Sequence, residues 1–221
     1  MSAPVLLEAR GLVVEYAPGR RVLDGVDLVL RAGESVSIVG PSGSGKSTLL
    51  AHLAGLRRPD GGAVCFEGRP LAARASSELD RFRADRVGFV FQRAALLPFL
   101  TVRENVALAL ACLEAAARDS GAARVDRLLE WTGLAALADR RADRLSVGEA
   151  QRVAVARALV KDPPLVLADE PTGALDAAGA AAIVDLLLCD RGERAVVIAT
   201  HDARVSARCE RVLAMERGRL A

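Results

Sequence analysis

Residues 40–47 read Gly40-Pro41-Ser42-Gly43-Ser44-Gly45-Lys46-Ser47, and this stretch decides the fold. It matches G-x-x-x-x-G-K-[ST], follows an apolar strand expected at 35–39 and precedes a helix expected over 47–56. In that context glycines let backbone N–H groups close around phosphate oxygens, and the helix N-terminus adds the positive end of its dipole. The pattern predicts a nucleotide site built from residues 40–47 and Thr48. There Lys46 reaches the β- and γ-phosphates and Ser47 holds Mg²⁺.

The lysine content of the chain supports this interpretation of Lys46. Only Lys46 and Lys161 are lysines among the 30 basic residues, and all the others are arginines. Arginine presents a planar fork, whereas lysine presents a compact ammonium group. A compact ammonium is therefore predicted to be required at Lys46.

A second candidate site lies in the stretch Leu165-Val166-Leu167-Ala168-Asp169-Glu170, an apolar strand that ends in two carboxylates. Asp169 is placed to bind the Mg²⁺ shell, and Glu170 is placed to polarise an attacking water. By itself the pattern is equally typical of a buried strand followed by a solvated acidic turn. Together with the phosphate loop it favours nucleotide hydrolysis.

The order of the expected elements is typical of a layered α/β fold. The chain opens with strands at 6–15 and 22–30, and its middle, about 76–133, is mostly helical, with a strand at 87–91 and a helix over 101–117. It then returns to strands at 165–169, 195–200 and 211–215, with a helix at 176–189. We expect one domain over 1–221 with a helical lobe inserted at about 76–160.

Composition excludes several classes of protein. Hydrophobic residues make up 52% of the 221 residues, which argues against disorder, and a net charge of +2 does not suggest nucleic acid as a partner. The four cysteines lack zinc-ligand spacing, which favours buried thiols in a reducing compartment. Neither a signal peptide nor a long apolar run is recognisable, so a role at the membrane needs a partner.

The stretch Leu145-Ser146-Val147-Gly148-Glu149, followed by Ala150-Gln151-Arg152-Val153-Ala154, resembles the signature motif and helix of the ABC ATPase family. The resemblance covers essentially the whole chain. Other positions match the family's adenine-stacking aromatic, Q-loop glutamine, D-loop aspartate and switch histidine, in that order: Tyr16, Gln92, Asp176 and His201. Each has a structural alternative, namely strand-end packing, a surface amide, a helix N-cap and a loop residue.

The resemblance implies a P-loop NTPase core of ABC ATPase type with an antiparallel β subdomain and an inserted α-helical lobe. It implies ATP and Mg²⁺ as cofactors, Glu170, His201 and Gln92 as catalytic residues, and Gln92 beside Ser47 and Asp169 at the metal. A second copy is implied to bind head to tail, so that Ser146 and Gly148 contact the γ-phosphate held by its Lys46 loop. Asp176 belongs to the same nucleotide site.

The implied function is that of an ATP-hydrolysing subunit that drives an integral membrane permease from the cytoplasmic face of the cell membrane. The segments 87–92, 96–98, 100–106 and 169–176 resemble the lipoprotein-release, macrolide-export and cell-division subclass. In such proteins a helix of the partner docks near 92–105, where Phe99 and Leu100 are candidate contacts. The alternative, suggested by the cell-division relatives, is an ATP-gated signalling module that acts on a membrane partner.

Val147 departs from the family pattern, which usually has glycine at this position. A β-branched residue does not easily adopt positive φ or allow a phosphate to approach closely. We therefore expect Val147 to slow ATP turnover without abolishing it. A P-loop kinase would leave the signature motif and His201 without a role, and analysis of the reaction products would test that class.

Overall fold

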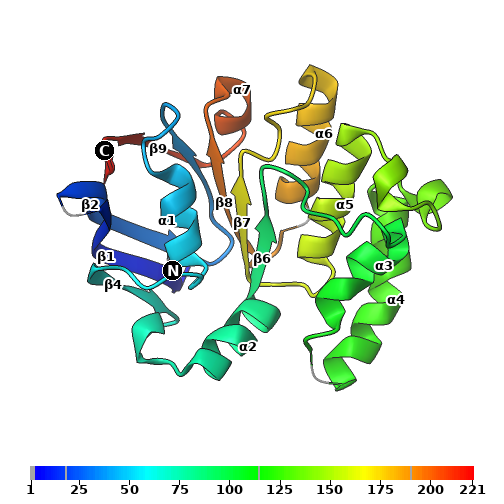
Figure 1. Ribbon diagram of the computed structural model, residues 1–221, viewed down its shortest axis with the longest axis horizontal. Helices are drawn as coiled ribbons and strands as arrows, with labels where there is room; N and C mark the ends of the chain where they lie inside the picture. The colour runs from blue at the N-terminus through cyan, green and yellow to red at the C-terminus, as the bar shows by residue number, and fades with distance from the viewer. Residues whose placement is uncertain (1–2, 18, 114, 190) are drawn as a thin grey trace.

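A computed structural model describes residues 3–17, 19–113, 115–189 and 191–221, with no account of the side chains of 115–120. Its centre is a sheet with the strand order β10-β9-β3-β8-β7-β6 (Figure 1). The strands from β9 to β6 are parallel, and β10 pairs antiparallel with β9. Their bounds are Ser35–Val39 (β3), Val87–Val90 (β6), Leu165–Asp169 (β7), Ala195–Thr200 (β8), Arg211–Glu216 (β9) and Arg219–Leu220 (β10).

The central strands are apolar on both sides because helices cover both faces of the sheet. From β7, Leu165 and Leu167 pack in the same cluster as the leucines of α1 (Lys46–Leu53). Val166 and Ala168, which alternate with them, pack with α5 (Val147–Leu159) and α6 (Ala177–Leu188). The predicted continuous apolar strands therefore have partners on each side.

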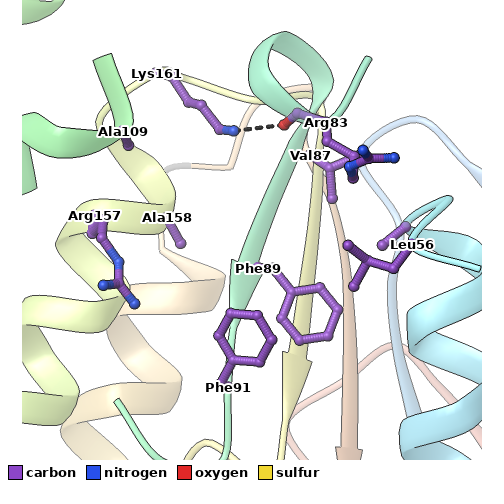
Figure 2. A pocket seen from close by; sticks show the side chains of 10 residues that line it. Leu56, Arg83, Val87, Phe89, Phe91, Ala109, Arg157, Ala158 and Lys161 are labelled. Carbon is purple, nitrogen blue, oxygen red and sulfur yellow. Dashed lines mark hydrogen bonds between the residues drawn. The ribbon is translucent and has the colours of Figure 1, made fainter. Parts of the chain in front are cut away.

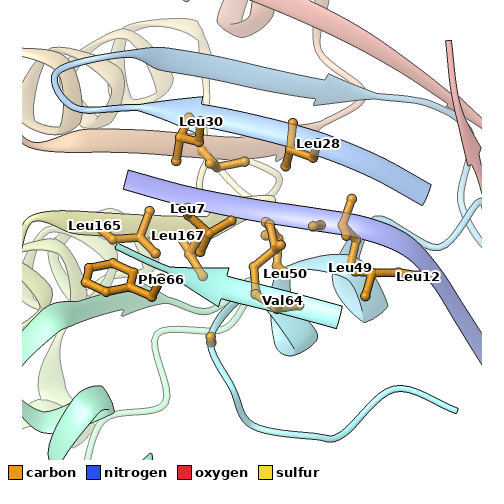
Figure 3. Packing of buried hydrophobic residues seen from close by; sticks show 14 of the residues in the cluster. Leu7, Leu12, Leu28, Leu30, Leu49, Leu50, Val64, Phe66, Leu165 and Leu167 are labelled. Carbon is orange, nitrogen blue, oxygen red and sulfur yellow. The ribbon is translucent and has the colours of Figure 1, made fainter. Parts of the chain in front are cut away.

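An antiparallel sheet of order β2-β1-β4-β5 packs on the other side of α1 (Figure 3). Leu7 and Leu12 of one strand meet Leu49 and Leu50 of the helix in one buried cluster. The sequence predicted the first two strands but missed the others, although Gly61-Gly62 followed by Val64 and Phe66 is a strand signal. The bounds are Val5–Ala17 (β1), Arg20–Arg31 (β2), Gly61–Phe66 (β4) and Arg69–Pro70 (β5).

The helical region has two parts that pack differently. Helix α2 (Ser76–Arg86) buries Leu79 and Phe82 in the cluster of the two sheets, and the following β6 is an edge strand of the central sheet. A separate cluster begins at Val102 and joins α3 (Val102–Ala107), α4 (Ala115–Trp131) and one face of α5. Residues 76–90 of the expected lobe thus pack with the core.

The continuous helix expected over 101–117 was a wrong prediction. Helix α3 ends at Ala107 and a 3₁₀ turn follows at Leu108–Leu110; position 114 lies outside the described residues, and α4 begins at Ala115. Leu110 packs so closely on α4 that a Cβ added at Gly121 would lie 2.5 Å from its Cδ2 atom. Packing between the two helices therefore outweighs local helix propensity.

The remaining helical segments are short: α7 is Ala203–Ser206, and 3₁₀ turns lie at Leu71–Ala73, Ala135–Leu137 and Ala142–Arg144. None of the helices in the described ranges combines the length and hydrophobicity that crossing a bilayer requires. The prediction of buried thiols is wrong for Cys112 and Cys189, which are exposed, and right for Cys65.

Candidate functional site

The predicted site residues follow four neighbouring strands of the central sheet. The phosphate loop follows β3, His201 follows β8, Glu170 follows β7, and Gln92 comes two residues after β6. These strands are adjacent in the order β3-β8-β7-β6 and run parallel. Because carboxyl ends of parallel strands meet at one edge of a sheet, residues far apart in the sequence share one site.

The phosphate loop needs glycine where it approaches other backbone. A Cβ added at Gly40 would overlap the carbonyl oxygen of Met215, and one at Gly45 would lie 2.8 Å from the carbonyl oxygen of Val22. Gly45 also has φ +110°, a conformation that side-chain-bearing residues rarely adopt. Lys46 starts α1 with only 6% of its surface exposed, and its Nζ donates to the Gly40 carbonyl at 2.8 Å.

The structure pairs two oxygen-bearing side chains, Ser47 in the first turn of α1 and Asp169 at the end of β7. The Ser47 hydroxyl donates to Asp169 Oδ1 at 3.0 Å. Burial raises the pKa of Asp169, and the neighbouring carboxylate of Glu170 raises it further, while the Ser47 hydrogen bond opposes them. Hydroxyl and carboxylate oxygens are the ligands that Mg²⁺ prefers, so this pair fits the predicted metal role.

Two other predicted site residues, Lys46 and His201, lie close to the Glu170 carboxylate. Its side chain is 12% exposed and lies 3.7 Å from Lys46 Nζ, and His201 Nδ1 lies 3.0 Å from both of its carboxylate oxygens. The backbone of Glu170 has φ +44°, and its N–H donates to the Ala199 carbonyl at 2.9 Å. A non-glycine residue in this region is strained, and such strain clusters at functional sites.

Tyr16 reaches the site from the antiparallel sheet. Its ring is 57% exposed, its hydroxyl lies 2.9 Å from Thr48 Oγ1, and the Arg57 guanidinium lies 5.9 Å from its centroid. Tyr16 and the phosphate loop line a cavity of about 390 Å³. Two residues that line the cavity, Arg20 and Val22, belong to no motif and were not predicted from the sequence. The lining residues are Tyr16, Arg20, Val22, Ser42, Gly43, Gly45, Lys46, Ser47, Thr48, Gln92, Glu170 and His201.

The signature motif lies elsewhere, at the N-terminus of α5. Ser146 is the N-cap, where its hydroxyl accepts from Glu149 N–H at 3.3 Å and its own N–H donates to the Glu149 carboxylate at 2.7 Å. The backbone hydrogen bond from Ser146 lowers the pKa of Glu149 most. Neither Ser146 nor Gly148 lines the cavity, nor does Asp176, which caps α6 by accepting from Gly179 N–H at 2.8 Å.

The structure corrects one argument about Val147. This residue is the first of α5, its φ is not positive, and its side chain is 60% exposed. The prediction of backbone strain at this position is therefore wrong, because the first turn of a helix accepts a β-branched residue. The second argument, that Val147 crowds an approaching phosphate, stays a prediction.

A family profile described as ABC transporter matches residues 23–173. The lipoprotein-releasing system ATP-binding protein LolD of Chromohalobacter salexigens is 42% identical over 98% of this chain and 93% of its own length. The macrolide export ATP-binding/permease protein MacB 1/2 of Paracoccus denitrificans is 42% identical over 97% of this chain and 33% of its own.

Among solved structures, the dimeric post-hydrolysis state of the ATP-binding cassette MJ0796 bound to ADP and Pi superimposes with a TM-score of 0.87. It is 36% identical to this chain and covers 97% of it, while this chain covers 96% of MJ0796. The motifs, the fold and the relatives agree, and the chain therefore belongs to the ABC transporter family as one of its ATP-binding, ATP-hydrolysing subunits.

Proposed function

We propose that the chain, as one nucleotide-binding domain over 1–221, binds Mg²⁺ and ATP in the cavity beside Lys46. ATP hydrolysis there drives a membrane permease. The observation that carries this proposal is the convergence of Lys46, Glu170 and His201 at the carboxyl edge of the sheet. Their contacts join a phosphate-binding ammonium, a carboxylate base and an imidazole within one network.

Each residue of this network has a role that its contacts support. Glu170 orients and polarises the attacking water, and His201 holds that carboxylate in place through Nδ1. Ser47 and Asp169, with Gln92 at the cavity wall, would hold Mg²⁺, which supplies charge neutralisation to the phosphates when bound. Tyr16, which lines the same cavity, offers a ring on which the adenine stacks.

The position of the signature motif supports a head-to-tail dimer. Ser146, Gly148 and Asp176 lie outside the cavity of their own chain, so a second copy has to present them to the nucleotide. The helix N-terminus at Ser146 directs backbone N–H groups and a positive dipole end outward, as an anion requires. Binding of ATP between two copies would stabilise the closed state, and hydrolysis would release it.

The permease partner is supported by the names of the relatives, because one is a lipoprotein-releasing ATP-binding protein and another joins its ATPase to a permease. With such a partner, the chain would act at the cytoplasmic face of the membrane. For its docking site we propose the groove beside the segment that follows β6, lined by Leu56, Phe89 and Phe91. Phe99, 62% exposed, and Leu100 lie outside that groove and stay predicted contacts.

Replacing Glu170 by glutamine tests this function. The amide keeps the size of the side chain but lacks the negative charge, so we expect ATP binding to persist and hydrolysis to fall by at least about a hundredfold. The ATP-bound dimer should accumulate, which size-exclusion chromatography with ATP would measure. As a control, Lys46→Ala should abolish ATP binding. Normal hydrolysis in either variant would refute the assigned site.

The same variant distinguishes transport from signalling. In a reconstituted complex with its permease, Glu170→Gln should stop substrate movement if ATP hydrolysis supplies the work. Persistence of the biological output in this variant would instead favour the ATP-gated signalling module. The names of the relatives favour transport.

A further inference from the structure

The Tyr16 ring is exposed, and the structure contacts it at two places, its hydroxyl and its face. The hydroxyl lies 2.9 Å from Oγ1 of Thr48 in the first turn of α1, although 57% of Tyr16 is exposed. Over the ring, the Cζ atom of the Arg57 guanidinium lies 5.9 Å from the centroid. This distance is within the range, up to about 6 Å, over which a cation is attracted to the face of an aromatic ring.

The segment that carries Arg57 is fastened to the strand that carries Tyr16. Asp60 N–H donates to the Val13 carbonyl at 3.0 Å, and the Asp60 carboxylate accepts from Glu15 N–H at 2.8 Å. Val13, Glu15 and Tyr16 all belong to β1. The path of the chain therefore keeps Arg57 near the ring, so their contact does not depend on the long side chain alone.

Arg57 has no competing partner in the parts of the chain that the structure describes, where its guanidinium forms neither an ion pair nor a hydrogen bond. Leu56, the preceding residue, lines the groove beside Phe89 and Phe91 instead (Figure 2). Tyr16 lines the nucleotide cavity, whereas Arg57 does not. The guanidinium therefore contacts the ring from outside the cavity and leaves the cavity side open to a base.

A ring that is fixed before a ligand arrives binds that ligand more tightly. An exposed ring that turned freely would lose this freedom when a base stacked on it, and the lost entropy would weaken binding. Attraction between the guanidinium and the ring restricts the ring in advance. Arg57 can thus raise the affinity for a nucleotide without touching it.

We propose that Arg57 is a positioning residue for nucleotide binding, which holds the Tyr16 ring from outside the cavity so that the opposite face meets the purine base. The inference rests on the proposed function, which places ATP in this cavity. It deepens that function by naming the residue that orients the surface on which the base stacks. In the complex the base, the ring and the guanidinium form three layers.

The test measures binding to the intact chain by titration calorimetry in magnesium-free buffer, so that hydrolysis does not interfere. Arg57→Gln removes the charge, whereas Arg57→Lys keeps a cation. Arg58→Gln is the matched control, because it removes the same charge from the next residue, which is likewise exposed. The ligands are ATP and inorganic tripolyphosphate, which has no base. Arg57→Gln is also combined with Tyr16→Ala, since a residue that acts through the ring has no effect once the ring is removed.

We expect Arg57→Gln to weaken ATP binding by about two- to fivefold, the contribution of an exposed contact between a cation and a ring, and to leave tripolyphosphate binding unchanged. Arg57→Lys should lose less, and Arg58→Gln should bind ATP as the wild type does. In the Tyr16→Ala background, Arg57→Gln should weaken ATP binding no further.

A second readout observes the ring itself. Tyr16 is the only tyrosine of the chain, so nuclear magnetic resonance of protein with ¹³C-labelled tyrosine reports on this ring alone. In the nucleotide-free protein Arg57→Gln should shift the ring resonances, and Arg58→Gln should leave them in place. Unchanged resonances in Arg57→Gln would mean that the guanidinium does not hold the ring, which contradicts the inference.

The binding data can overturn the inference in two ways. Equal or tighter ATP binding by Arg57→Gln would do so, and tighter binding would show that the guanidinium covers the face that the base needs. A loss that extends equally to tripolyphosphate, or that persists without the ring, would instead assign Arg57 a general effect of charge. Both results leave the proposed function standing. A wild-type chain that binds no ATP would refute the proposed function together with this inference.

Discussion

Replacing Gly40 by alanine tests whether the phosphate loop is shaped by close backbone packing. The added Cβ would overlap the carbonyl oxygen of Met215 and lie 2.9 Å from Ser44 Oγ. Both distances are well inside the roughly 3.5 Å at which such contacts become favourable. The neighbouring backbone cannot move freely, because Val39 before the loop pairs with Ala214 of β9.

The cost of this overlap should reach at least about 3 kcal/mol, the upper end for an overpacked core. In a chain of this size about 1 kcal/mol lowers the melting temperature by about 2–4 °C, so Gly40→Ala should lose about 6–12 °C or more. Gly43→Ala is the matched control, because Gly43 has φ +80° but nothing within 4 Å of its Cβ position. Its cost is only the backbone strain, roughly 1–2 kcal/mol.

Thermal unfolding of the nucleotide-free variants, followed by circular dichroism, measures this difference without interference from ATP binding. Gly40→Ala should melt below Gly43→Ala, and both should melt below the wild type. If Gly40→Ala melted at or above the temperature of Gly43→Ala, the steric account of the loop would be refuted.

Two further predictions concern nucleotide binding and turnover. Tyr16→Ala should weaken ATP binding by about 5- to 150-fold, because stacking of a base on an aromatic ring contributes about 1–3 kcal/mol. Tyr16→Phe keeps the ring and loses only the 2.9 Å contact with Thr48, so titration calorimetry should show a much smaller loss; equal affinity in wild type and Tyr16→Ala would contradict this. Val147→Gly should raise the steady-state ATPase rate, because less bulk then separates the signature motif from the phosphate held by a second copy, and an unchanged rate would contradict it.

Much of the central fold was predictable because its signals are local. The strands at 35–39, 165–169 and 195–200 match their predicted bounds, since continuous apolar runs identify strands that are buried on both faces. The helix at 101–117 was mispredicted because packing against α4 decides where it ends, whereas β4 was missed although residues 61–66 carry a local strand signal. The glycines of the phosphate loop were recognised by spacing, but the reason for Gly40, its contact with β9, was not visible there.

In the candidate site, too, local features could be predicted from the sequence, whereas contacts between distant segments could not. The sequence by itself predicted a phosphate-binding loop at residues 40–47 and determined that Asp169 and Glu170 end a buried strand, because neighbours in the chain create both features. Only the tertiary structure decided that His201 and Lys46 meet at Glu170, that Tyr16 contacts Thr48, and that Arg57 lies over the Tyr16 ring. These contacts join segments distant in the chain, and strand order and helix packing bring them together.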